Sequence, residues 1–178
     1  SKEVGLALQL EAARVRPGQR DIKRVVAELG GKNAILIDSD ADLDEAVPGV
    51  IASGFGFQGQ KCSACSRVIV LEDCYDAFVS RLVEAVRSLR VGPAEDPGTA
   101  VGPLVDAEAR DRVQRYLSLG REEGTLLAQV DPGPWANEGY FVAPTLFADV
   151  SPQACLAQEE IFGPVLAVMK ARDFTEAL

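Results

Sequence analysis

The chain has 178 residues, with 18 Lys and Arg against 27 Asp and Glu, a formal net charge of -9, and no histidine. Without an imidazole, it cannot form a Ser/His/Asp or Cys/His catalytic pair, a histidine zinc site or a histidine general base. Any catalysis must therefore use carboxylate, thiol, lysine or backbone groups. The acidic balance also argues against nucleic acid and anionic membranes as partners, because both attract basic proteins.

Hydrophobic residues make up 47% of the chain and charged residues 25%, both close to the globular average. No stretch has the ~18 consecutive apolar residues of a membrane helix, so we expect no membrane partner. Four cysteines in a chain without a signal peptide indicate reduced thiols and a cytoplasmic protein. The chain begins without Met, and residues 173–178 are typical of the first turn of a helix, so we expect a piece of a longer protein.

The N-terminal third is predicted to contain two helices and two strands. Apolar spacing predicts a helix over residues 1–15, with Ser1 as its N-cap. Two β-branched runs predict strands at 24–27 and 34–37, and the Gly-Gly turn between them places Glu28 at a strand end. Residues 38–40 (Asp-Ser-Asp) are expected to cap a helix over 41–55.

The remaining pattern alternates strands with long helices. We expect strands at 67–72, 125–130, 140–146 and 165–169, helices at 74–90 and 106–123, and irregular loops at 92–103 and 131–139. Strands that alternate with long helices predict an α/β fold: a mainly parallel, open sheet flanked by helices.

The densest cluster of unusual residues runs from Gly54 to Cys65, with the sequence GFGFQGQKCSAC. Its glycines match the dinucleotide fingerprint G-x-G-x-x-G. That fingerprint must follow a strand and open a helix, whereas here a predicted helix precedes it and only residues 60–66 separate it from the next strand. We therefore reject a dinucleotide-binding turn at this position.

Cys62 and Cys65 form a C-x-x-C pair that has two further interpretations. Two thiols without histidine do not complete a zinc site, so we expect no metal. A redox pair normally opens a helix, whereas a strand is expected here, and Cys65 fits a small buried residue at the strand entrance. A non-catalytic dithiol redox domain stays open as an alternative function.

Cys62 can also be a nucleophile on a glycine-rich turn. Clustered glycines let the backbone approach a substrate closely and direct N–H groups at a developing oxyanion. Such a thiol needs a base, and the candidate is Glu28, which lies beside Gly30-Gly31. An isolated glutamate at a strand end is, however, more often a surface residue.

Three motifs in chain order resemble the signatures of the aldehyde dehydrogenase superfamily: Glu28-Leu29-Gly30-Gly31-Lys32, Gly59-Gln60-Lys61-Cys62, and Glu159-Glu160-Ile161-Phe162-Gly163-Pro164. The resemblance covers the whole chain but only part of the family's usual length. It implies an aldehyde dehydrogenase catalytic-domain-like fold. Residues 1–20 would be the tail end of the cofactor-binding domain, and residues 21–178 a catalytic domain truncated at both ends. The parent enzyme is expected to be a homo-oligomer.

The resemblance also implies roles for individual residues. Cys62 matches the nucleophile that adds to the aldehyde carbon, and Glu28 the general base that activates water to hydrolyse the thioester. Glu160 matches the residue that holds the nicotinamide ribose, Phe162 the ring beside the nicotinamide, and Ser1 a serine near the cofactor pyrophosphate. The implied cofactor is NAD, with NADP left open.

The local sequence of residues 59–67, GQKCSACSR, is most similar to one branch of the family. That branch oxidises L-glutamate γ-semialdehyde, the open form of pyrroline-5-carboxylate, to L-glutamate in proline catabolism, and Ser63 matches a serine that helps to bind the substrate carboxylate. An aldehyde dehydrogenase of another substrate class is the alternative. Relatives that pass the thioester to coenzyme A or phosphate are disfavoured by Glu28. Because the family's second oxyanion donor and its adenosine-binding lysine precede Ser1, we expect the isolated chain to be almost inactive.

Overall fold

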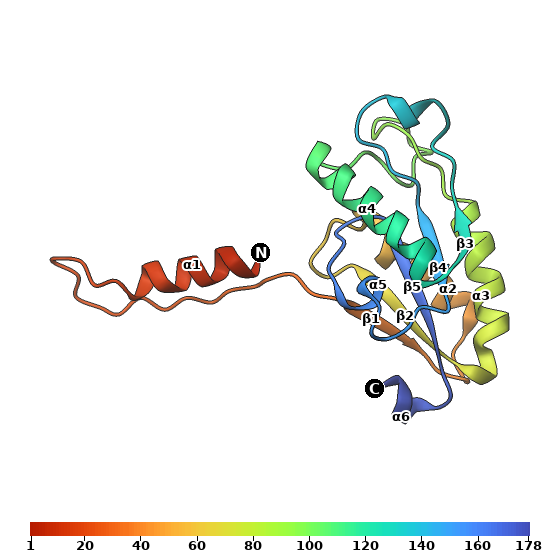
Figure 1. Ribbon diagram of the computed structural model, residues 1–178, viewed down its shortest axis with the longest axis horizontal. Coiled ribbons are helices and arrows are strands. Elements are labelled where there is room, and N and C mark those ends of the chain that lie inside the picture. The colour runs from red at the N-terminus through yellow and green to blue at the C-terminus, as the bar shows by residue number, and fades with distance from the viewer. The chain divides into compact units, whose positions relative to one another are not determined.

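The computed structural model describes residues 1–178, which divide into two compact units, residues 1–31 and 32–178 (Figure 1). The first unit contains one helix, α1 (Lys2–Ala13), and the predicted N-cap is confirmed because Ser1 Oγ accepts a hydrogen bond from the Val4 N–H at 3.4 Å. Leu29 packs on Gly5, the one buried residue of α1. The apolar side chains of α1 are otherwise exposed: Val4, Leu6, Leu8 and Leu10.

The strand predicted at residues 24–27 is wrong. This stretch is irregular, and Val26 is 89% exposed. A β-branched run becomes a strand only when a neighbouring strand takes up its backbone hydrogen bonds, and no strand pairs with this one. Glu28 therefore lies in irregular backbone rather than at the end of a strand.

The 32–178 unit contains a five-stranded sheet of order β1-β2-β5-β4-β3 (Figure 1). Its strands are β1 (Asn33–Ile37), β2 (Cys65–Leu71), β3 (Thr125–Gln129), β4 (Thr145–Ala148) and β5 (Val165–Ala171). All neighbouring pairs are parallel except β3 and β4. The predicted mainly parallel α/β sheet is confirmed.

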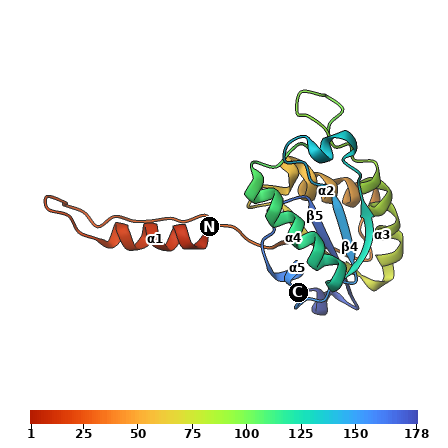
Figure 2. The same ribbon diagram turned by 45° about the horizontal axis from the view of Figure 1, so that its top comes forward.

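Helices cover both faces of this sheet (Figure 2). One face carries α2 (Leu43–Phe55) and α3 (Glu72–Arg87), and the other carries α4 (Ala107–Glu123) and the short α5 (Cys155–Gln158). A final turn, α6 (Phe174–Ala177), follows β5.

The central strand β5 shows how its sequence builds two cores. Because side chains alternate across a strand, Leu166 and Val168 join the core under α2 and α3, whereas Val165, Ala167 and Met169 join the core under α4 and α5. All five are buried. An almost continuous apolar run is therefore needed where a parallel strand is covered on both sides.

Several predicted boundaries move for local reasons. Asp42, not residues 38–40, caps α2, because its side chain accepts from the Asp44 N–H at 2.9 Å. The strand predicted at 140–146 begins only at Thr145, since the preceding Pro144 has no N–H for the ladder. Asp106, the predicted first residue of a helix, is the N-cap of α4, and its side chain accepts from the Ala109 N–H at 2.8 Å. A short 3-10 helix, η2 (Gly133–Asn137), lies within the loop at 131–139.

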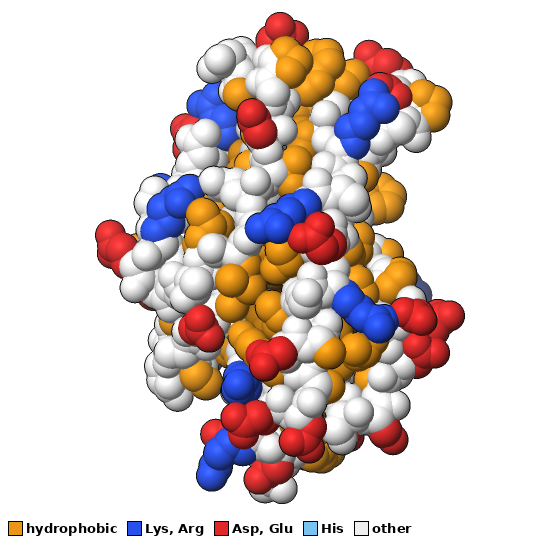
Figure 3. All heavy atoms as spheres, turned by 90° about the vertical axis from the view of Figure 1, so that its right-hand side faces the viewer, with side chains coloured by type: hydrophobic (Ala, Val, Ile, Leu, Met, Phe, Trp, Pro, Cys, Tyr) orange, Lys and Arg blue, Asp and Glu red, His pale blue; other side chains and the backbone are white.

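Acidic and basic side chains are interspersed over the face of the 32–178 unit that α3 helps to form (Figure 3). Arg81 of α3 pairs with Asp44 of α2 at 2.5 Å, and Arg87 pairs with Glu84 one turn away at 2.9 Å. Because the charges on this face are of mixed sign, they do not form the continuous basic surface that nucleic acids require. None of the helices is both long enough and apolar enough to cross a membrane.

Candidate active site

The three motifs lead into three parallel strands that are neighbours in the sheet. Lys32 ends the first motif and precedes β1, the Cys62 motif precedes β2, and the segment 159–164 precedes β5. The sheet order β1-β2-β5 therefore brings the amino ends of all three strands to the same edge. The candidate site of the 32–178 unit lies at that edge.

A tight left-handed turn presents the second motif. After α2, the 3-10 helix η1 (Gly56–Gly59) contains three consecutive residues with positive φ: Phe57 (52°), Gln58 (58°) and Gly59 (68°). A Cβ atom on Gly59 would lie 2.4 Å from the backbone oxygen of Gly163. Position 59 thus requires glycine, because its φ is positive and because a side chain would collide with Gly163. The missing side chain lets the second motif touch the third.

Cys62 is exposed in the following turn, which the hydrogen bond from Ala64 N–H to Lys61 O closes at 3.1 Å. Asn33, at the start of β1, donates from Nδ2 to the backbone oxygens of Cys62 at 2.7 Å and Ala64 at 3.2 Å. Ser63 is exposed next to Cys62. The structure therefore offers an accessible thiol on a turn that is held to the sheet, which is the arrangement that a cysteine nucleophile requires.

Cys65 has the opposite environment. Its side chain is buried, its thiol donates to the Arg67 carbonyl at 3.2 Å, and its N–H donates to Ser53 Oγ at 3.1 Å. Burial raises the pKa of the Cys65 thiol to about 11. In a reactive dithiol, the pKa of the attacking cysteine is lowered, whereas here the pKa of Cys65 is raised. This environment therefore favours Cys65 as a structural residue at the strand entrance.

The third motif is anchored residue by residue. Tyr116 Oη donates to Glu159 at 2.6 Å, and Arg112 Nε donates to the Ile161 carbonyl at 3.1 Å. Phe162 is half-buried and has a φ of 57°, a conformation that non-glycine residues rarely adopt. Glu160 is exposed.

Lys32 is a buried amine at the end of the first motif, and its Nζ makes no hydrogen bond. Burial, with a further contribution from the positive charge of Arg67, lowers the pKa of Lys32 to about 8. The carboxylate of Glu160 acts in the opposite direction and favours the charged amine. Lys32 and Glu160 therefore lie close enough to interact electrostatically, which joins the first motif to the third.

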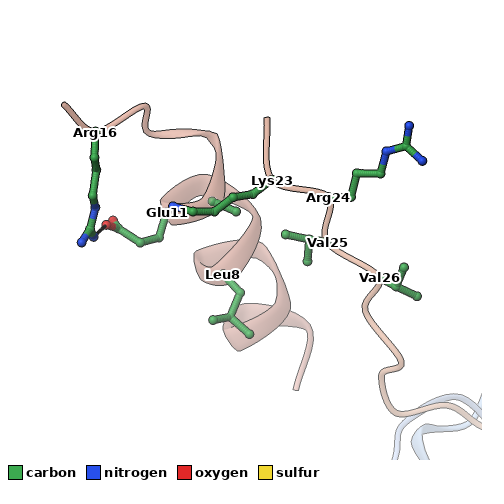
Figure 4. A pocket seen from close by; sticks show the side chains of 8 residues that line it. Leu8, Glu11, Arg16, Lys23, Arg24, Val25 and Val26 are labelled. Carbon is green, nitrogen blue, oxygen red and sulfur yellow. Dashed lines mark hydrogen bonds and ion pairs between the residues drawn. The ribbon is translucent and has the colours of Figure 1, made fainter. Parts of the chain in front are cut away.

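Ser1 and Glu28 belong to the 1–31 unit, and both are exposed there. A hollow of about 400 Å³ in that unit is lined by α1, Arg16 and residues 23–26, and Arg16 and Glu11 of its lining form an ion pair at 2.6 Å (Figure 4). Neither Ser1 nor Glu28 lines it. The 32–178 unit contains the other predicted residues, Cys62, Ser63, Glu160 and Phe162, and the approach of Gly59 to Gly163 brings their two segments into contact.

Sequence reasoning did not identify Asn33, Arg112 or Tyr116 as parts of the site. One signal for Asn33 was present, because it directly follows the first motif at the start of a predicted strand. Arg112 and Tyr116 are four positions apart, which places them on one helix face, but nothing local to them indicates the segment that they contact. No group of three or more Cys, Asp or Glu side chains could hold a metal ion.

Comparison with known proteins gives consistent results. The model of the aldehyde dehydrogenase family matches residues 1–178. The 1-pyrroline-5-carboxylate dehydrogenase of Geobacillus kaustophilus is 49% identical over 178 residues, which are 100% of this chain and 34% of the relative. The chain thus spans about a third of the length of the curated relatives that it matches.

Two solved structures are similar over nearly the whole chain. Proline utilization A from Bdellovibrio bacteriovorus, inactivated by N-propargylglycine, is 53% identical with a TM-score of 0.93, covering 100% of this chain and 18% of that one. A 1-pyrroline-5-carboxylate dehydrogenase from Thermus with bound NAD is 46% identical with a TM-score of 0.90, covering 99% of this chain and 34% of that one.

Proposed function

Because the chain belongs to the aldehyde dehydrogenase family, we propose that it acts within a longer enzyme that oxidises L-glutamate γ-semialdehyde to L-glutamate with NAD. The open-chain semialdehyde of 1-pyrroline-5-carboxylate would be the substrate, in proline catabolism. The observation that carries this proposal is the exposed Cys62 on a glycine turn packed directly against the third motif. The names of the relatives at 46–53% identity support the substrate.

The chain's own residues divide the reaction between them. Cys62 adds its sulfur to the aldehyde carbon, and its backbone N–H faces the developing oxyanion. NAD, when bound, would supply the acceptor for the hydride that leaves this carbon. Loss of the hydride would leave a thioester to Cys62. Glu28 takes a proton from water, which attacks the thioester and releases the acid and the free thiol. Ser63 binds the substrate carboxylate.

Three residues would hold the cofactor. Glu160 is an exposed carboxylate, which can accept hydrogen bonds from ribose hydroxyls. Phe162 offers an apolar ring that is only half-buried, and Ser1 lies at a helix N-terminus, where phosphate oxygens bind favourably. These residue types therefore fit a dinucleotide.

We assign residues 1–20 to the end of a cofactor-binding domain and residues 21–178 to the catalytic domain. Because the chain spans about a third of its relatives, the isolated 178 residues are expected to have little activity. The complete enzyme would be a cytoplasmic homo-oligomer.

The test is a steady-state assay of the complete enzyme with L-glutamate γ-semialdehyde and with simple aliphatic aldehydes. Cys62→Ala should lower kcat by more than about 10³-fold, because it removes the nucleophile. The matched variant Cys65→Ala should keep most of the activity, since that thiol is buried. Equal loss in both variants would favour the dithiol alternative, and a preference for long-chain aldehydes would exclude the proposed substrate.

A further inference from the structure

Helix α4 contacts the segment of residues 155–163, which includes most of the third motif, along one continuous stripe. The residues that make these contacts are separated by steps of one, three, four and three positions, and such spacing falls on a single helix face. They are Arg112, Val113, Tyr116, Gly120 and Glu123. The helix and the segment lie side by side in both ribbon views (Figures 1 and 2).

The contacts at the C-terminal end of α4 hold the start of the segment. The two carboxylate oxygens of Glu123 accept hydrogen bonds from the Cys155 N–H at 3.0 Å and the Leu156 N–H at 2.9 Å. A Cβ atom on Gly120 would lie 3.0 Å from Leu156 Cδ2, so the segment packs closely on the helix here.

The contacts nearer the N-terminus of α4 hold the motif itself. Tyr116 donates to Glu159 at 2.6 Å, and Arg112 donates to the Ile161 carbonyl at 3.1 Å. A Cβ atom on Gly163 would lie 2.3 Å from Val113 Cγ2, so Gly163 also packs on α4. Helix and segment therefore run in opposite directions and remain in contact from residue 155 to residue 163.

These anchors alternate with the two residues assigned to the cofactor. Glu159, Ile161 and Gly163 are held by α4, whereas Glu160 and Phe162 stand between them. Phe162 has a left-handed backbone, which costs energy and persists only where the flanking residues fix it. Anchors on both sides of Phe162 supply that constraint.

We propose that Tyr116 and Arg112 are positioning residues, which fix Glu160 and Phe162 at the places where they bind the nicotinamide end of the cofactor. This proposal rests on the proposed function. The Tyr116 hydroxyl suits the task because it donates to the Glu159 carboxylate at 2.6 Å, and burial together with this neighbouring charge raises its pKa to about 12. The Arg112 guanidinium offers several N–H donors in a rigid, planar arrangement.

Each variant has a matched control, which makes the same chemical change at a residue that does not hold the segment. Tyr116→Phe removes one hydroxyl, and Tyr140→Phe removes a hydroxyl that makes no hydrogen bond. Arg112→Gln shortens the side chain and removes the guanidinium that donates to Ile161, whereas Arg112→Lys keeps a long, charged donor. Arg115→Gln removes an exposed guanidinium from α4 that forms no hydrogen bond or ion pair with residues 155–163.

In the complete enzyme, Tyr116→Phe and Arg112→Gln should raise the KM for NAD by about threefold to tenfold, as expected for the loss of one typical intramolecular hydrogen bond. The kcat and the KM for the aldehyde should change by less than about twofold. Arg112→Lys should restore part of the affinity, and both control variants should match the wild type. A merely structural role would lower kcat through a smaller folded fraction and leave the KM for NAD unchanged, which would overturn the proposal.

A second measurement does not depend on the substrate. Amide hydrogen exchange of residues 159–163 in the 178-residue chain should be faster in Tyr116→Phe and Arg112→Gln than in the wild type, and unchanged in Tyr140→Phe and Arg115→Gln. Equal exchange in all proteins would overturn the positioning role. Failure of the wild-type enzyme to oxidise L-glutamate γ-semialdehyde would instead contradict the proposed function, and the exchange result would still decide the role of Tyr116 and Arg112.

Discussion

Asn33 holds the turn that presents Cys62. Its side-chain amide donates to the carbonyls of Cys62 and Ala64, at 2.7 and 3.2 Å, and its own backbone oxygen accepts from Ser66 Oγ at 3.3 Å. One residue at the start of β1 thus ties down both ends of the turn. No other side chain donates a hydrogen bond to the Cys62 carbonyl. The orientation of the thiol therefore depends on an amide donor at position 33.

Changing Asn33 to Asp should destabilise the chain more than changing it to Ala. Alanine removes two hydrogen bonds to a partly exposed turn, at a cost of about 1 kcal/mol, whereas aspartate points carboxylate oxygens at two carbonyls and adds repulsion. The free energy of unfolding in urea measures both effects. The control is Asn137→Asp, which makes the same change at an exposed position of η2. Equal stability of the two Asn33 variants would show that the amide does not hold the turn.

Lys32 makes the stability of the chain depend on pH in a definite direction. Its folded-state pKa of about 8 lies below the ordinary value of 10.5, mainly through burial and secondly through Arg67. Between these two values the unfolded chain binds the proton more tightly than the folded chain. The contribution of Lys32 to the free energy of unfolding therefore rises as the pH increases from about 8 to 10.5, and it is constant and unfavourable below pH 8.

Lys32→Met keeps the length of the side chain and removes its charge. Relative to the wild type, this variant should be more stable at pH 7, and the difference should shrink as the pH rises towards 10.5. The difference is the quantity to measure, because Cys65, with its pKa raised to about 11, changes stability in the opposite direction in both proteins. The control is the exposed Lys2→Met. A difference that does not vary with pH would contradict a buried, destabilised ammonium at position 32.

Elements differ in how far the sequence alone determines them. The strands at 34–37, 67–72 and 165–169 were predicted within a few residues because each carries the apolar pattern of a covered strand. The run at 24–27 has the same β-branched composition but no partner strand, and composition cannot supply one. Of the predicted strand at 140–146, only Thr145 and Leu146 lie in β4, which begins directly after Pro144, a residue without an N–H to donate.

The candidate site shows the same division. Motif residues such as Cys62 could be chosen from the sequence, and their convergence follows once β1, β2 and β5 are parallel neighbours. The contacts of Asn33 with Cys62 and of Tyr116 with Glu159 join residues 29 and 43 positions apart. Such pairs follow from how helices and strands pack, so local spacing does not predict them.

At the scale of the whole molecule, the buried cores belong to one unit. The core between the sheet and helices α2 and α3 begins at Ile37 and ends at Ala177, and the core under α4 and α5 lies between Leu104 and Met169. In residues 1–31 the only buried residue is Gly5. The burial of apolar surface that drives folding is therefore concentrated in residues 32–178.

A chain that begins at Gly31 should consequently fold. We expect it to unfold cooperatively on heating, with a Tm within about 4 °C of that of the 178-residue chain. A change of ~1 kcal/mol in the free energy of unfolding shifts the Tm of a domain of this size by about 4 °C at most. Circular dichroism at 222 nm measures the transition. The comparison variant ends at Pro164 and lacks β5, which lies between β2 and β4, so it should show no cooperative transition. If the chain that begins at Gly31 also lost its transition, residues 1–31 would have to contribute to folding despite their exposure.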